Sequence, residues 1–247
     1  MKKCFKISLL LILIVVLSFG CGKEEKQNNA NSNKNKVSDK TKVNNLSESY
    51  IKYAEIKGKK LEKLTELTEN SDNYLLGMAL IPFGMLDLAF VPASICGLEE
   101  AEAVRQMFLY ENIKYKVEGN KCTVSYTAGG DNTTFVASYD NKTDSVTMDI
   151  YEDDQITMTS EYVKIKDGYA SQVYTAADDN NYTLYQTMFQ NDDIYTSIYD
   201  NVSKPLTIFK NNNLKSDFAK NGDYLYISIV NEEVNATVEG EIVNFNN

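Results

Sequence analysis

The sequence predicts an α+β fold in which N-terminal helices pack on a long antiparallel β-meander. Two observations support this prediction: apolar residues recur at helical spacing after residue 45, and short strand-like segments separated by turn residues fill the chain from residue 113 onward. No strand-helix-strand alternation occurs, which argues against a parallel doubly wound sheet. With 247 residues, 43% of them hydrophobic, the chain is long enough to form one ordinary globular core.

The first twenty residues have the features of an export signal. Lys2, Lys3 and Lys6 precede an apolar run over residues 7–19. A basic start followed by a short apolar run is typical of exported proteins. The run is shorter than the roughly 20 residues that a membrane-spanning helix needs, although a retained N-terminal anchor is the alternative.

Residues 17–22 read Leu-Ser-Phe-Gly-Cys-Gly, with Gly20 directly before Cys21. This resembles the lipobox of bacterial lipoproteins, from which Ser18 and Phe19 depart. The resemblance implies that signal peptidase II removes residues 1–20 and that Cys21 carries a diacylglyceryl group with palmitate-like chains. Membrane lipid is then the partner of Cys21, and the protein is expected on the extracytoplasmic face of a bacterial membrane.

Residues 21–45 contain few large apolar side chains, so we expect the lipidated cysteine to be followed by a flexible tether. Residues 46–247 are expected to form a single globular domain. That domain is predicted to be helical over 46–111 and mainly β over 113–247.

An amphipathic helix is predicted over residues 46–69, because Leu46, Tyr50, Tyr53 and Leu61 recur at helical spacing. Its polar face carries charges of both signs and is expected to be solvated. This predicted wet face includes Lys57, Lys59, Lys60, Glu62, Lys63 and Glu66.

Residues 74–98 form the most apolar stretch after the signal, with Asp87 as the only charge. Hydropathy alone would allow a membrane span, but Pro82, Pro92 and the central Asp87 favour one or two short helices buried against the sheet. A further helix is predicted over residues 99–111.

Turn-forming Asn, Asp and Gly residues divide the rest of the chain into consecutive hairpins. The predicted strands span residues 113–118, 121–128, 133–139, 144–151, 155–166, 169–176, 182–190, 194–200, 205–210, 223–230 and 233–245.

Strands 182–190 and 194–200 carry bulky side chains on both faces, whereas a half-buried strand is normally polar on one. A curved, incompletely closed half-barrel with helices on its concave face explains this pattern, and a flat sheet with tyrosines over a wet face is the alternative. The layout is similar to that of the half-barrel lipoprotein carriers. The expected ligand face comprises Tyr182, Tyr185, Phe189, Tyr195 and Tyr199.

Composition excludes several kinds of chemistry. The chain has no histidine, which excludes Ser-His-Asp and Cys-His centres and histidine metal sites, and its net charge of −10 argues against a nucleic-acid partner. The acidic pairs Asp153-Asp154, Asp178-Asp179 and Asp192-Asp193 fall at expected turns, so no metal ligand is assigned to them. No catalytic residue or cofactor is assigned either. Glu161 is expected on an exposed strand face.

Cys96 and Cys122 would remain after processing and could either form a disulfide or stay as separate core thiols. The leading functional hypothesis is a non-catalytic lipid-anchored surface protein that binds an apolar ligand or an envelope protein. A carboxylate-dependent hydrolase of envelope polysaccharide and a structural envelope-assembly protein are the alternatives.

Overall fold

The computed structural model describes residues 46–69, 75–177, 181–203, 214 and 217–243. All of them belong to one compact unit, residues 43–247. The signal peptide, Cys21, the tether and the strand predicted at 205–210 lie outside the described residues.

The helices precede the sheet in the chain, as predicted. The first described helix, α2 (Leu46–Glu69), has the bounds that the apolar spacing predicted. The apolar stretch that follows forms α3 (Leu75–Met78), α4 (Leu80–Phe90) and the 3-10 helix η1 (Val91–Ser94). Short buried helices were predicted here. Within the described residues, no helix combines the length and hydropathy that crossing a membrane requires.

Both prolines of this stretch lie where a helix tolerates them. Pro82 is in the first turn of α4 and Pro92 is near the start of η1, so neither removes a hydrogen bond from a helix interior. The last of the described helices, α5 (Glu100–Gln106), is shorter than predicted, because the chain turns over residues 107–109 and then enters the sheet.

The described strands form one open antiparallel sheet in which each strand pairs only with its sequence neighbours. Because β1 and β11 are both edges, the described sheet is not closed, which is compatible with both the half-barrel and the flat-sheet interpretations. The strands are β1 (Glu111–Glu118), β2 (Lys121–Ala128), β3 (Asp131–Asp140), β4 (Ser145–Glu152), β5 (Gln155–Ile165), β6 (Gly168–Ala176), β7 (Tyr182–Gln190), β8 (Asp193–Val202), β9 (Leu225–Val230), β10 (Glu233–Val238) and β11 (Glu241–Val243).

Turn residues set the strand ends because they adopt backbone conformations that most side chains disfavour. Asp153 and Asp154, at the β4–β5 turn, have φ values of 46° and 65°, in the left-handed region that Asp and Asn tolerate better than bulky residues. The prediction of a single strand over residues 233–245 was wrong. Glu239 (φ 50°) and Gly240 (φ 80°) form a turn that divides it into β10 and β11.

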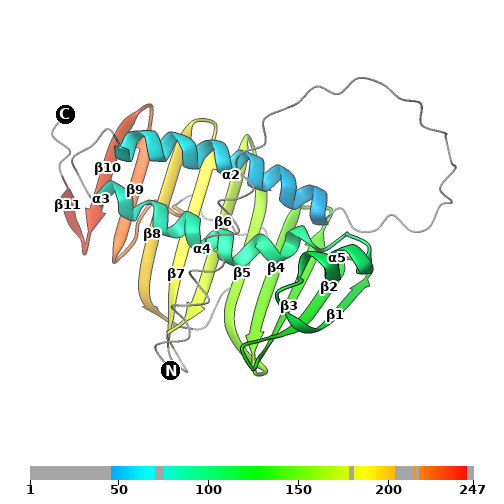
Figure 1. Cartoon of the computed structure of the whole chain (residues 1–247). Coiled ribbons are helices and arrows are strands. Elements are labelled where there is room, and N and C mark those ends of the chain that lie inside the picture. Colours follow the sequence, from blue (N-terminus) through cyan, green and yellow to red (C-terminus); the bar gives the residue numbers. More distant parts are fainter. Residues whose placement is uncertain (1–45, 70–74, 178–180, 204–213, 215–216, 244–247) are drawn as a thin grey trace, which may run out of the picture. The chain divides into compact units, whose positions relative to one another are not determined.

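The helices α2 and α4 lie side by side across one face of the sheet, called the helix face below (Figure 1). Strand alternation supplies apolar side chains to this face, as in β4, where the buried residues Val146 and Met148 alternate with the half-exposed Thr147. The core between helices and sheet includes Tyr53, Phe83, Phe90, Phe135, Met148, Tyr162, Val173, Phe189, Ile198 and Ile227.

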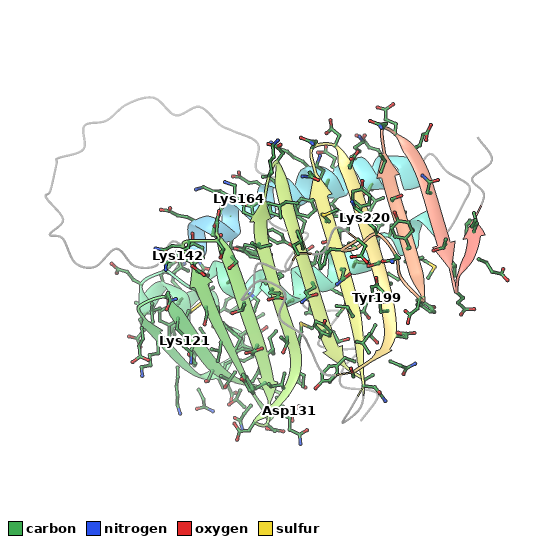
Figure 2. All side chains as sticks on the ribbon, turned by 180° about the vertical axis from the view of Figure 1, so that it is seen from behind. Lys121, Asp131, Lys142, Lys164, Tyr199 and Lys220 are labelled. Atoms are coloured by element: carbon green, nitrogen blue, oxygen red, sulfur yellow. A yellow bond between two sulfur atoms is a disulfide. The ribbon has the colours of Figure 1, made fainter. Side chains whose placement is uncertain are left out.

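Residues 217–221 form a strap that lies on the other side of the sheet, called the opposite face. Phe218 and Ala219 are buried against Ala170 of β6 and Met188 of β7. Figure 2 shows Lys220 of the strap and Tyr199 of β8 on this face. Strand alternation therefore produces two packed surfaces over β6–β8, which explains the bulky side chains on both faces there.

Candidate functional site

An aromatic cluster centred on Tyr53 fills the interface between α2 and the sheet. The ring of Tyr53 stacks on that of Tyr162, with centroids 4.3 Å apart and an interplanar angle of 1°. The rings of Phe90, Tyr169 and Phe189 surround it with centroids 5.4–6.0 Å away. All five side chains are buried, so this part of the interface is closed by aromatic packing.

The hydroxyl of Tyr53 continues into a buried hydrogen-bond chain. It donates to Ser171 Oγ at 3.2 Å, and Ser171 Oγ lies 2.7 Å from Thr187 Oγ1. Burial raises the pKa of Tyr53 well above its ordinary value. The hydroxyl therefore stays protonated and serves as a donor that orients α2 on β6.

A second polar group fixes the start of α2. Ser49 Oγ donates to Asp144 Oδ1 at 2.7 Å, and Tyr139 OH donates to the same oxygen at 3.2 Å. Tyr162 OH lies 3.0 Å from Ser49 Oγ. Burial and the charge of Asp144 raise the pKa of Tyr139 to about 12. These bonds join the first turns of α2 to the β3–β4 turn.

Lys57, one helical turn after Tyr53, also faces the core, where it forms an ion pair with Asp87 of α4. Lys57 is only 4% exposed, so its assignment to the wet face of the helix was wrong. Burial lowers its pKa to about 8. Two sequence features are consistent with this pair, although neither identifies it: the four-residue spacing of Lys57 from Tyr53, and the single charge, Asp87, in an apolar stretch.

The sheet beneath this region also carries buried hydroxyls. Thr196 of β8 lies beside Thr187 in the strand register. Its Oγ1 is buried and forms no hydrogen bond with any described residue. The helix face therefore combines a sealed aromatic cluster with a row of hydroxyl groups, and none of these is a strong nucleophile without an activating base.

The structure divides the predicted ligand face between the two sides of the sheet. Tyr185 and Phe189 pack on the helix face, where Phe189 is fully buried in the Tyr53 cluster. Tyr195 and Tyr199 lie on the opposite face and contact the strap. Lys220 Nζ is 5.3 Å from the ring centroid of Tyr195, and Tyr199 OH donates to Asn221 O. Tyr182 packs against Tyr174 on that face, with ring centroids 6.5 Å apart.

Glu161 belongs to a chain of buried polar side chains on the opposite face. The strap N–H of Ala219 donates to Gln186 Oε1 at 3.3 Å, Gln186 Nε2 donates to Gln172 Oε1 at 3.2 Å, and Gln172 Nε2 donates to Glu161 Oε1. Glu161 is 3% exposed, so the expectation of an exposed strand face was wrong. The register aligns the three side chains on β5, β6 and β7, and sequence alternation could not reveal that they are covered.

Cys96 and Cys122 form a disulfide, one of the two states that the sequence left open. The bond joins the segment after η1 to β2. Nearby, the backbone N–H of Gly97 donates to Tyr115 OH at 3.0 Å, and Tyr115 OH lies 3.0 Å from the carbonyl oxygen of Leu98. Both sets of contacts hold this segment on the first hairpin.

The two described acidic pairs lie at or directly beside turns. Asp153 and Asp154 occupy the β4–β5 turn and Asp192 the β7–β8 turn, which are at opposite ends of the sheet because hairpin turns alternate between its ends. Asp178 and Asp179 lie outside the described residues. In the described part of the chain, no three His, Cys, Asp or Glu side chains form a group that could hold a metal ion.

No protein-family model matches this chain. No curated protein and no solved structure matches it either.

Proposed function

We propose that the protein is a bacterial lipoprotein, anchored through Cys21 on the extracytoplasmic face of a membrane, whose β-domain binds an envelope protein without catalysis. One observation carries the binding role. The opposite face of β1–β5 offers a broad, half-exposed polar surface, whereas aromatic packing closes the centre of the helix face.

This polar surface, called the hydroxyl face below, consists of short side chains that project from neighbouring strands. Thr134 Oγ1 donates to Ser125 Oγ at 2.8 Å, and Thr159 Oγ1 donates to Asp149 Oδ1 at 3.0 Å, so the side chains are held in place. Non-obligate protein interfaces are about as polar as the rest of a protein surface. The hydroxyl face comprises Thr123, Ser125, Thr134, Ser138, Thr147 and Thr159.

The geometry favours protein binding over the two other sites considered from the sequence, an apolar-ligand site and a hydrolase active site. An apolar ligand on the helix face would have to displace rings such as Tyr53 and Phe189, both of which are fully buried. A hydrolase needs two carboxyl groups that converge on one bond. The acidic pairs at the β4–β5 and β7–β8 turns are at opposite ends of the sheet, and Glu161 is engaged by an amide.

The anchor is tested by mass spectrometry of the processed N-terminus and by membrane fractionation. We expect an acylated Cys21 in the wild-type protein and release of Cys21→Ser from the membrane fraction. An unmodified N-terminal peptide or an intact leader would contradict the anchor.

The partner is tested by chemical cross-linking in intact membranes. We expect a discrete cross-linked species that is lost in Thr134→Arg and Thr147→Arg, because an arginine on the hydroxyl face blocks close approach. The matched control is Ile51→Arg, on the solvent side of α2, where Ile51 is 50% exposed. A species that survives both face variants, or release of sugars from purified envelope polysaccharide, would overturn this function.

A further inference from the structure

The end of α5 and the turn that follows it carry three of the seven exposed large apolar side chains of the described chain. Phe108 is 77% exposed, Leu109 63% and Val104 37%. These three side chains are called the apolar corner below. Large apolar side chains that are grouped and exposed usually mark a contact surface, whereas single ones need no explanation.

The apolar corner is held firmly by its neighbours. Met107, directly before it, is buried in the core, and Tyr110, directly after it, packs its ring on Tyr126 with centroids 4.4 Å apart. The N–H of Tyr110 donates to the carbonyl oxygen of Met107 at 2.9 Å, which closes the turn. Phe108 and Leu109 therefore project from a fixed turn, and contact with an apolar phase would cost little ordering entropy.

The start of α2 lies near the same edge of the sheet as this corner, namely the edge formed by β1. Leu46 belongs to the same buried cluster as Met107 and Cys122, and Figure 1 shows the first turns of α2 at the end that carries α5. The chain that leads from Cys21 therefore joins the domain near the β1 edge of the sheet rather than near the β11 edge.

We propose that the apolar corner inserts into the interface of the lipid bilayer to which Cys21 is attached. This inference rests on the proposed lipid anchor. The anchor makes the contact intramolecular, so a few side chains are enough to hold the domain against the membrane. Residues 22–45 join Cys21 to Leu46, and a chain spans at most about 3.3–3.6 Å per residue, so its length limits how far the corner can be from the surface.

Local charge decides which lipids favour the contact. Glu102 is paired with Arg105 at 2.7 Å, while Glu100 and Glu111 are exposed beside the corner. The contact is therefore hydrophobic, resists high salt, and is weaker on anionic than on zwitterionic bilayers.

The absence of tryptophan from the chain permits a direct test. The variant Phe108→Trp is expressed from the complete sequence, purified from the membrane fraction in its processed form, and reconstituted in phosphatidylcholine vesicles whose acyl chains carry bromine. The matched control is Ile242→Trp, because Ile242 in the edge strand β11 is also 77% exposed. We expect a blue-shifted emission and about threefold stronger quenching at position 108, as for a side chain at the acyl boundary. Adding Leu109→Ser to Phe108→Trp should reduce the quenching, whereas adding Ile51→Ser should not.

Flotation of the same vesicles separates the two proposals. Protein that floats but shows equal quenching at positions 108 and 242 overturns the corner contact and leaves the anchor standing. Protein that fails to float overturns the anchor and, with it, the contact. Stronger quenching at position 108 that increases with anionic lipid would overturn the hydrophobic mechanism.

Discussion

Lys57 of α2 and Asp87 of α4 form an ion pair between the two helices that cover the sheet, and the side chain of Lys57 is only 5% exposed. The pair joins two elements that are otherwise held by apolar packing. A charge in this position is stable only while its partner is present.

Removing the carboxylate alone should therefore destabilise the fold. We expect Asp87→Asn to lower the free energy of unfolding at pH 7 by about 3 kcal/mol, because it leaves a buried ammonium group without its counter-charge. Urea unfolding measures the change. Lys60→Met is the matched control, since Lys60 pairs with Asp192, whose side chain is 87% exposed, and should cost less than about 1 kcal/mol. Equal losses in the two variants would contradict the structural role of the pair.

Stability should rise with pH in a defined window because of Lys57. Burial lowers the pKa of Lys57 from 10.5 to about 8. Between these values the unfolded chain holds a proton that the folded protein has released, so the free energy of unfolding increases with pH. Above about pH 10 buried tyrosines act in the other direction, because burial raises the pKa of Tyr50 to about 12.

The measurement is urea unfolding of the wild type and Lys57→Met between pH 8 and pH 10. The wild type should gain up to about 1.4 kcal/mol per pH unit relative to the variant. Parallel pH profiles for the two proteins would show that Lys57 titrates as it does in an unfolded chain.

Two glycines should respond to alanine in opposite ways. A Cβ at Gly168 would lie 1.8 Å from the carbonyl oxygen of Phe189, so Gly168→Ala has to separate β6 from β7 and should cost about 2 kcal/mol or more. A Cβ at Gly58 in α2 meets nothing within 4 Å, so Gly58→Ala should stabilise the protein by about 0.5–1 kcal/mol. Thermal unfolding should show shifts of opposite sign, and a destabilised Gly58→Ala would contradict the helix at this position.

The disulfide should contribute measurably to stability. Cys96 and Cys122 are separated by 26 residues, for which the loop-entropy relation gives about 3.5 kcal/mol. We expect reductant to lower the free energy of unfolding of the wild type by this amount and to leave Cys96→Ala/Cys122→Ala unchanged. Two free thiols in the unfolded, unreduced domain would show that the bond does not form.

Much of the secondary structure followed from local chemistry. The predicted bounds of α2, β2 and β7 match the structure because apolar spacing and Asn, Asp or Gly turns act within a few residues. The helix predicted over 99–111 ends earlier because Met107 and Tyr110 anchor a turn to the core. That contact is tertiary and has no local signature.

The candidate site could be predicted only in part. The predicted ligand face grouped Tyr182 with Tyr185 and Phe189, whereas the structure places Tyr182 on the other side of the sheet. The sequence pattern could not say which side the helices would cover or that residues 217–221 would cover the other. Lysine has a long apolar stem and occurs on both wet and buried faces, so the periodicity around Lys57 did not reveal its partner across 30 residues of chain.

The sheet and the helices that cover it can be completed at different stages of folding. Each hairpin closes between sequence neighbours, so the sheet can form strand by strand as the chain is synthesised. The helix α2 precedes the described strands but cannot finish docking in that order, because it bonds the β3–β4 turn through Ser49, bonds the β7–β8 turn through Lys60, and places Leu64 in one buried cluster with Ile227 of β9. Complete docking of α2 therefore has to follow the formation of β9, and a chain that ends after β8 leaves the last turns of α2 without their packing partners.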